Sequence, residues 1–307
     1  MPPAATVSTA TGSLGSAGNL HGIAAMIAAN AVLSANDACL KLASSTLPTG
    51  ELIFIRNSIG ALAALIVVLS VGAGGRLRQL PLGLFSGRAV TDICGSLLFI
   101  MSLVRMPFAD AVAIGQCLPL MITAAAALVL GEAVGWRRWL ATGIGFVGVL
   151  LIIRPGTSAF TPASLLGLGS VVAITVRDLI TRRIPPAISS LLLAFLSMLA
   201  VAISSLGFLV VETWRIPNAT ELALLAAAGV MLFVGYVLLV MAMRSGEVAA
   251  VVPFRYTLVI WAILGGWLLW GELPDMLTVA GTAIVVAAGL YTLHREQLRR
   301  RLAAGHG

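Results

Sequence analysis

The sequence has little charge for its length: Asp, Glu, Lys and Arg make up 10% of the 307 residues, whereas hydrophobic residues make up 59%. Soluble domains carry about 25% charged residues, and a globule this apolar has too few polar side chains to cover its own surface. The composition therefore excludes a soluble enzyme. Disorder is excluded as well, because a disordered chain is rich in charge. A polytopic membrane protein remains.

Lysine, cysteine and histidine are also scarce. The one lysine, Lys41, follows Leu40, so the Gly-Lys-Ser/Thr of a phosphate-binding loop is absent. The three cysteines are isolated and form no CxxC pair, so we predict neither a disulfide framework nor a zinc site. The three histidines lie at the ends of apolar runs or in the tail, and neither HExxH nor GxSxG occurs. We therefore predict no enzyme activity, no metal and no other cofactor.

Ten apolar runs are long enough, at about 20 residues, to cross a membrane. They lie near residues 20–43, 50–72, 87–105, 109–130, 136–153, 163–181, 187–210, 221–242, 247–270 and 276–294. Residues 1–19 are rich in small residues and contain no Lys or Arg, so they predict a disordered tail rather than a signal peptide. Residues 295–307 form a basic tail. The sequence predicts an all-α membrane protein of ten transmembrane helices.

The arginines orient these helices. With the N-terminus inside, twelve arginines, Arg88 among them, fall in inner segments and three in outer loops. Cytoplasmic segments carry such an excess of positive charge, so we predict that both termini are cytoplasmic. The basic residues are scattered over short loops and form no patch, so nucleic-acid binding is not predicted.

The two halves of the chain resemble each other at an offset of about 140 residues. Gly131-Glu132 closes the fourth run and Gly271-Glu272 closes the ninth, and Asp37 aligns with Asp178. Because each half has an odd number of helices, the second must enter the membrane from the opposite side. The result is two inverted five-helix repeats, the architecture of many secondary transporters, which hold substrate near the midplane between the halves. The repeats are predicted to span residues 20–156 and 157–294.

The segment 241–291 reads MAMRSGEVAAVVPFRYTLVIWAILGGWLLWGELPDMLTVAGTAIVVAAGLY. It closely resembles the end of an EamA domain of the drug/metabolite transporter superfamily: a short turn, an apolar helix with proline near its start, a Gly-Glu closure and a glycine-containing last helix. Residues 101–154 give a second, similar copy, and the resemblance spans about residues 20–293. It implies an inner-membrane location and export or uptake of small metabolites. The implied cavity is lined mainly by helices one, three and four and their repeat mates.

The first helix offers the best candidate site. Asn30, Ser34, Asp37 and Lys41 are spaced by four, three and four residues and share one helical face. An ionised side chain at the bilayer centre costs about 2.5–3.5 kcal/mol, so it should face a cavity or a partner. We favour a stripe that lines the substrate path, with Asp37 as an amine contact or proton site. Alternatively, Lys41 or Arg56 neutralises Asp37 inside the protein. Of the four repeat mates, Thr175, Asp178 and Arg182 keep this polarity and Val171 does not.

Arg56, in the second helix, either holds a substrate carboxylate or phosphate bidentately or neutralises Asp37, and we slightly favour the second interpretation. Arg255 and Tyr256 follow Pro253, which leaves helix carbonyls unbonded near a cavity. They stand where the first repeat has Gly115-Gln116, a departure from symmetry that puts a symmetric binding site in doubt. We predict that these two residues and Gln116 line the cavity.

Other polar residues are predicted to be structural. Asp92 should pair with Arg88 one turn earlier rather than relay protons. Arg177 should snorkel to the cytoplasmic interface. Glu132 and Glu272 should share a cap or turn role, and the glycines of the fifth and tenth helices should allow close packing within the chain.

The sequence thus predicts a secondary transporter that moves an amino acid or similar small zwitterion by alternating access. Export is favoured by analogy with the family that the chain resembles. One alternative is uptake or exchange of a larger metabolite, such as S-adenosylmethionine or a nucleotide-sugar-like compound. Another is a non-transporting scaffold or channel. The predicted partners are a zwitterionic or amphipathic small molecule and membrane lipid.

Overall fold

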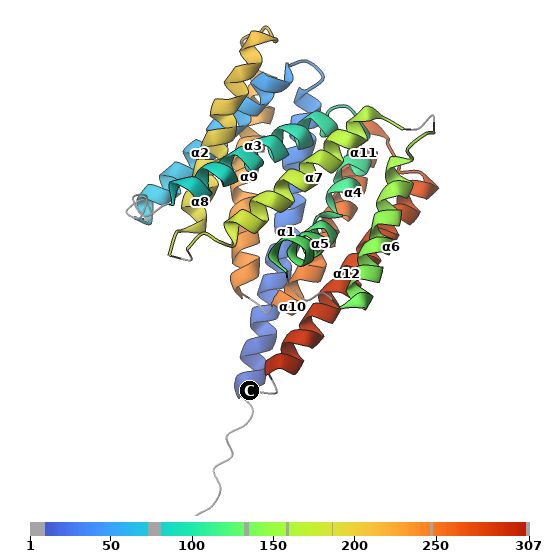
Figure 1. The fold of residues 1–307 in the computed structure, drawn as a ribbon. Helices are drawn as coiled ribbons and strands as arrows, with labels where there is room; N and C mark the ends of the chain where they lie inside the picture. The colour runs from blue at the N-terminus through green and yellow to red at the C-terminus, as the bar shows by residue number, and fades with distance from the viewer. Residues whose placement is uncertain are drawn as a thin grey trace, which may run out of the picture.

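The structure, a computed structural model, describes residues 10–72, 81–131, 135–157, 160–185, 187–245 and 248–304 (Figure 1). Ten helical spans in this part of the chain are long and apolar enough to cross a membrane. These residues form helices and no strands. The predicted all-α fold with ten transmembrane helices is confirmed.

The first half consists of five spans: α1 (Ala10–Ala43), α2 (Thr49–Ser70), α3 (Leu82–Leu103), α4 (Phe108–Gly115) with α5 (Leu118–Leu130), and α6 (Trp136–Ile153). In the second half, the first three spans are α7 (Pro162–Thr181), α8 (Ser190–Ser205) with the 3-10 helix η2 (Leu206–Val210), and α9 (Ala219–Ser245). The last two are α10 (Val248–Val251) with the 3-10 helix η3 (Val252–Tyr256) and α11 (Thr257–Trp270), and α12 (Met276–Ala304).

Three helices begin or end five or more residues beyond their predicted bounds. α1 begins at Ala10, so residues 10–19, predicted as a disordered tail, are helical, and α12 continues through Ala304 into the predicted basic tail. Extending an existing helix needs no new nucleus, and the Ala, Leu, Arg, Glu and Gln residues after Leu293 are good helix formers. α3 begins at Leu82, five residues before the predicted start at 87, so Arg88 lies in its second turn rather than at its first residues.

The fourth and ninth spans are broken at equivalent depths. α4 ends at Gly115 and α5 starts at Leu118, with Pro119 in its first turn. In the ninth span, Pro253 lies in η3, between α10 and α11. Proline lacks a backbone donor and clashes with the preceding turn, which interrupts the helix. The continuous helices predicted at 109–130 and 247–270 are therefore each divided. Broken helices are typical of the substrate sites of secondary transporters.

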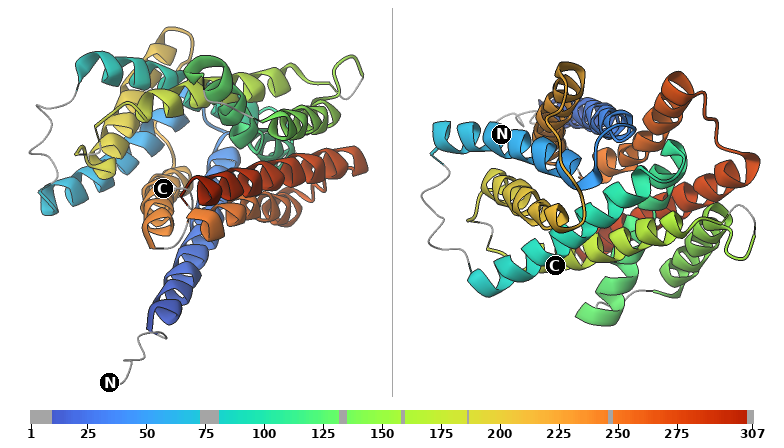
Figure 2. Two further views of the ribbon diagram at one scale, coloured as in Figure 1. Left: turned by 60° about the horizontal axis from the view of Figure 1, so that its bottom comes forward. Right: turned by 90° about the horizontal axis from the view of Figure 1, so that it is seen from above.

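The packing of the helices follows the repeat. α1 lies along α9, and the repeat maps this pair onto α7 and α3, which also lie side by side (Figure 2). The pairs α2–α8 and α6–α12 map onto themselves, and both pack together. The halves are thus interlocked, with each helix of one half against a helix of the other.

Both chain ends point the same way. The start of α1 and the end of α12 lie at one end of the bundle (Figure 1), as ten crossings require. We call this the inner end, following the predicted orientation, and the opposite one the outer end.

Candidate functional site

Arg56 of α2 is bound to α1 through Asn36. Its Nε donates a 2.9 Å hydrogen bond to Oδ1 of Asn36, and Nδ2 of Asn36 donates one of 2.8 Å to Oδ1 of Asp37. All three side chains are buried. Asp37 and Arg56, both in the described chain, make no direct ion pair, so Asn36 connects the two charges. Sequence reasoning missed Asn36 because it follows Ala35 on a different face from the polar stripe.

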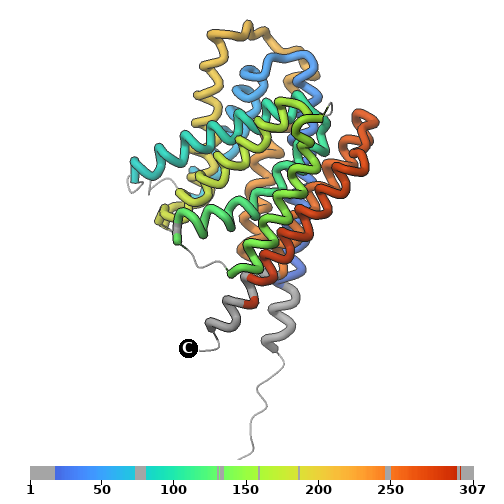
Figure 3. The backbone as a smooth tube through the Cα atoms, turned by 45° about the vertical axis from the view of Figure 1, so that its right-hand side comes forward, coloured from blue at the N-terminus to red at the C-terminus, as the bar shows by residue number. Residues whose placement is uncertain are grey.

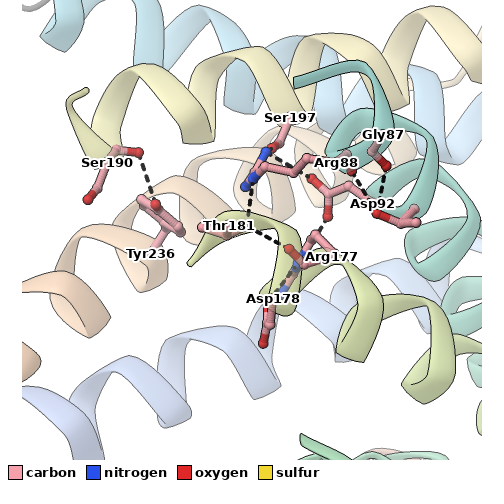
Figure 4. A network of polar contacts seen from close by, with 10 residues as sticks. Gly87, Arg88, Asp92, Arg177, Asp178, Thr181, Ser190, Ser197 and Tyr236 are labelled. Atoms are coloured by element: carbon pink, nitrogen blue, oxygen red, sulfur yellow. Dashed lines mark hydrogen bonds and ion pairs between the residues drawn. The ribbon is translucent and has the colours of Figure 1, made fainter. Parts of the chain in front are cut away.

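A second polar group, the inner ion network, joins α3 to α7 (Figure 4). Arg177 places Nη1 2.9 Å from Oδ1 of Asp92 and Nη2 2.8 Å from Oδ1 of Asp178. Arg88 lies 3.9 Å from Oδ2 of Asp92. We define the network by these four residues. Two arginines face two carboxylates, so its formal charges balance.

Arg88 extends the inner ion network to neighbouring helices. Its Nη1 donates a 2.6 Å hydrogen bond to Ser197 of α8, and its Nε donates one of 3.0 Å to Thr181 of α7 (Figure 4). The predicted Arg88–Asp92 pair is present, but the shorter contact of Asp92 is with Arg177. The prediction that Arg177 snorkels is wrong, because two carboxylates hold it inside the protein.

The two polar groups are repeat-related. Asn36 and Arg177 stand at an offset of 141, each immediately before the paired Asp37 and Asp178. Each side chain donates a hydrogen bond to the aspartate that follows it. Each also bonds to a residue of a neighbouring helix: Asn36 accepts from Arg56 of α2, and Arg177 donates to Asp92 of α3. The inverted repeat places the first group nearer the outer end and the second nearer the inner end.

A cavity of about 210 Å³ lies between these two groups. Its polar lining includes Arg56, Asn57, Arg88, Asp92, Ser96, Arg177, Ser197 and Tyr236. Its apolar lining includes Phe99, Ile100, Ile174, Met198, Val201 and Leu232. Three arginines and one aspartate make the lining cationic. Both halves contribute, as predicted, but the lining comes from spans two, three, six, seven and eight. Spans one, four and nine, which the resemblance implied, do not take part, and spans two and seven do.

The predicted stripe on α1 does not line this cavity. Asn30 instead donates from Nδ2 to the carbonyls of Phe254 and Arg255, at 3.0 and 3.1 Å, and to Oγ1 of Thr257 at 3.0 Å. It thereby satisfies backbone acceptors at the break that Pro253 causes. Two other predicted residues are buried outside the cavity lining: Ser34 and Thr175, of which the latter donates to the carbonyl of Val171 in its own helix.

The outer end of the stripe forms the outer latch, defined by Lys41, Met106, Phe108, Trp270 and Glu272. Lys41 Nζ donates a 2.8 Å hydrogen bond to the carbonyl of Met106, lies 3.5 Å from Oε2 of Glu272, and sits 4.9 Å from the ring centre of Trp270. The same Oε2 accepts from the backbone N–H of Phe108 at 3.1 Å. The latch connects both halves at the outer end.

The outer latch overturns one prediction and supports another. The proposed Asp37–Lys41 pair is wrong, because Lys41 lies in the last turn of α1 and pairs with Glu272. The predicted cap role of Glu272 is confirmed, since it binds the first N–H of α4. Its neighbour Gly271 ends α11 in the left-handed region with φ +66°, as Gly131 ends α5. Glu132 lies outside the described residues.

The helix breaks carry the remaining predicted residues, Arg255, Gln116 and Tyr256, and none of the three belongs to the lining of the 210 Å³ cavity, contrary to the prediction. Arg255 lies in η3, and in the described part of the chain no hydrogen bond or ion pair forms on its guanidinium. Gln116 is buried at the break between α4 and α5. Tyr256 points elsewhere: its buried hydroxyl packs against Gly289 of α12 and has no hydrogen-bond partner among the described residues.

Comparison with known proteins places these features in one family. The model of the EamA-like transporter family matches twice, at residues 20–154 and 161–293. The chain is 29% identical over 273 residues to the pseudopaline exporter CntI of Pseudomonas aeruginosa, covering 87% of this chain and 94% of that protein. It is 25% identical over 278 residues to the S-adenosylmethionine uptake transporter of Rickettsia prowazekii, covering 91% and 94%.

Two more similarities extend this set. A riboflavin transporter of Rhizobium johnstonii is 29% identical over 222 residues, covering 71% of this chain and 72% of that protein. A protein of known crystal structure shares the fold with a TM-score of 0.63 at 18% identity, covering 91% of this chain and 97% of that chain. The matches run across both halves, in agreement with the repeat read from the sequence.

Proposed function

This chain belongs to the EamA-like transporter family, and we propose that it exports an amino acid or a similarly small zwitterion across the inner membrane. Its relatives are named as transporters of small metabolites. The chain is therefore a small-metabolite transporter and not an enzyme, as predicted. The finer proposal rests on the cavity between the two halves.

The chemistry of the cavity supports a zwitterion. Arg56 is fixed through its Nε alone, which leaves its terminal nitrogens free to bind a carboxylate bidentately. Asp92 uses Oδ1 for Arg177, but its Oδ2 has only the 3.9 Å contact with Arg88, so Oδ2 can accept from an ammonium group. The apolar lining offers room for an aliphatic or aromatic side chain. One zwitterionic substrate can therefore contact Arg56 with its carboxylate, Asp92 with its ammonium group and the apolar lining with its side chain.

The size of the cavity favours an amino acid over the larger alternatives. Pockets for drug-sized ligands measure roughly 300–1,000 Å³, and this cavity measures about 210 Å³. S-adenosylmethionine or a nucleotide-sugar-like compound would need a wider cavity. The pseudopaline exporter relative supports export as the direction.

The other predicted residues receive different roles in this proposal. Asp37 keeps Asn36 and Arg56 in place from α1. Arg255 and Gln116, at the two helix breaks, contact substrate after the two halves rock against each other during alternating access. Asp178 holds Arg177 in the inner ion network. Asn30, Ser34, Thr175 and Tyr256 support the helices around the breaks.

Flux into proteoliposomes tests the proposal, using the full chain and a panel of labelled amino acids together with S-adenosylmethionine and riboflavin. We expect saturable flux of a subset of amino acids. Arg56→Gln should lower affinity by about 10-fold or more, because a hydrogen bond to a charged group contributes about 1.5–3 kcal/mol. Arg105→Gln, which removes an exposed charge at the outer end, is the matched control.

Three outcomes would count against the proposal. Flux without selectivity would indicate a channel, and transport of S-adenosylmethionine in preference to every amino acid would indicate the larger substrate class. Equal affinity in wild type and Arg56→Gln would remove Arg56 from the binding site.

A further inference from the structure

The outer surface of the α6–α12 pair contains a groove that the transport site does not use. The two helices touch in the half nearer the outer end, where a Cβ added to Gly148 would lie 2.7 Å from the carbonyl oxygen of Gly281. Toward the inner end a groove of about 340 Å³ lies against both helices. Its walls are Leu140, Ala141 and Ile144 of α6 and Ala288 of α12.

The mouth of this groove has a different chemistry from its walls. Trp136 and Arg137 lie at the start of α6, and Tyr291 lies near the end of the tenth span, so all three are at the inner end. The Arg137 guanidinium sits 5.4 Å from the ring centre of Trp136. Trp and Tyr favour the depth of lipid headgroups. A cation stacked on one interfacial aromatic ring, with a second such ring in the same lining, is suited to an anionic headgroup.

The depth of the groove suits an acyl chain. Trp136 and Ile144 are eight residues apart, a rise of about 12 Å along a helix. The side chains of Leu140 and Ile144 are about half exposed, at 56% and 49%, and α6 and α12 form one edge of the bundle (Figures 1 and 3). An apolar groove that runs from a cationic interfacial mouth into the hydrocarbon matches a lipid rather than a water-soluble ligand.

We propose that the α6–α12 groove binds one anionic phospholipid of the inner leaflet, with its phosphate at Arg137 and an acyl chain along Leu140 and Ile144. The complementary charges of Arg137 and the headgroup decide the lipid class. A basic residue near a membrane surface contributes about 1 kcal/mol toward anionic lipid, which corresponds to about fivefold in affinity. This site is independent of the proposed substrate.

Native mass spectrometry of the full chain in mild detergent tests this site, with phosphatidylglycerol and phosphatidylcholine added in turn. The wild type should bind one phosphatidylglycerol more tightly than phosphatidylcholine. Arg137→Gln should weaken phosphatidylglycerol binding about fivefold and leave phosphatidylcholine unchanged. Arg244→Gln, which removes an exposed charge at the end of α9, should change neither.

A second variant tests the groove itself. Ile144→Trp fills the groove from a lipid-facing position and should remove the tightest adduct of both lipids. The proposal fails if Arg137→Gln binds phosphatidylglycerol as the wild type does. It also fails if Ile144→Trp keeps its lipid but turns a dimer into a monomer, because the groove would then be an interface between two copies of the chain.

Discussion

At the scale of single residues, the neutral side chain of Asn36 determines how two buried charges are arranged. It accepts from Arg56 and donates to Asp37, so it links a buried cation to a buried anion without direct contact between them. Burying a charge without hydrogen-bond partners is costly, and the Asn36 amide supplies one partner to each of the two charges. The orientation of Arg56 toward the cavity therefore depends on Asn36.

We predict that Asn36→Ala and Arg56→Gln are coupled. Each variant alone should lower substrate affinity, since Asn36→Ala frees Arg56 from its fixed position. The double variant should lower affinity less than the two effects added together, with an interaction of about 1–2 kcal/mol. A double-mutant cycle on the flux assay measures this, and strict additivity would show that Asn36 does not position Arg56.

The sequence could indicate Asp37 and Arg56 but not Asn36. Charged residues within apolar runs are conspicuous because of their cost in the membrane, whereas a neutral amide is not. Asn36 also lies one position, or about 100° of helical rotation, away from the face of Asp37. Its role depends on a neighbouring helix, and single-helix periodicity carries no information about that neighbour.

Asp275 provides a pH-dependent prediction outside the membrane. Its carboxylate accepts from Arg154 and from the backbone N–H of Thr278 at 2.8 Å, where it caps α12. These hydrogen bonds, that from Arg154 above all, lower the pKa of Asp275 from 3.8 to about 2. A lowered pKa in the folded state means that the charged form stabilises the fold above pH 3.8, and that this contribution is lost as the pH falls through 2.

The expected result is a difference between two melting curves. Between pH 4 and pH 2, the melting temperature of the wild type should fall more than that of Asp275→Asn, which has no carboxylate to protonate at this position. Thermal unfolding in detergent at stepped pH measures it. Parallel curves for the two proteins would show that the pair with Arg154 does not contribute to stability.

At the scale of elements, the sequence located the spans well and their interruptions poorly. The fifth span, predicted at 136–153, matches α6 at both ends. Length and apolarity define a membrane span directly. The sequence predicts continuous helices through Pro119 and Pro253, because the residues around both prolines are apolar. Whether proline only bends a helix or divides it depends on partners such as Asn30, which lies more than 200 residues before the second break.

The close packing of α6 and α12 gives a prediction with a matched control. A Cβ on Gly148 would lie 2.7 Å from the carbonyl oxygen of Gly281, whereas one on Gly143 of the same helix would meet nothing within 4 Å. Gly148→Ala should destabilise the protein by roughly 1–3 kcal/mol, the usual effect of overpacking. Gly143→Ala should leave stability unchanged or slightly higher. Thermal unfolding in detergent compares them, and equal melting temperatures would contradict the packing.

At the scale of the whole molecule, the cavity has a connection between the halves on each side. The outer latch joins α1 and α4 to the turn after α11, and the inner ion network joins α3 to α7. The internal repeat and its inverted topology were evident from the sequence. Which spans line the cavity was not, because that depends on how the halves tilt against each other, and repeat positions alone do not fix a tilt.

We predict that Glu272→Gln loosens the outer end. The variant loses the charge that faces Lys41 and weakens the bond to the Phe108 N–H, so the turn between α3 and α4 should exchange its amide hydrogens faster. Hydrogen–deuterium exchange read by mass spectrometry measures this for peptides that contain Phe108. Peptides that contain Arg88, at the inner end, should be unchanged. Equal exchange of the Phe108 peptide in both proteins would show that the latch does not hold the outer end closed.

The scarcity of lysine has a practical consequence at this position. Lys41 carries the only side-chain amine of the chain, and that amine is covered by Trp270 and bonded to Met106 and Glu272. Reductive methylation with isotope-labelled formaldehyde would therefore add a single side-chain NMR reporter, with no residue to be mutated. Its rate of modification, compared with and without substrate, would measure how much of the time the outer end is open. The native Lys41 thus provides a spectroscopic reporter on the outer end during the transport cycle.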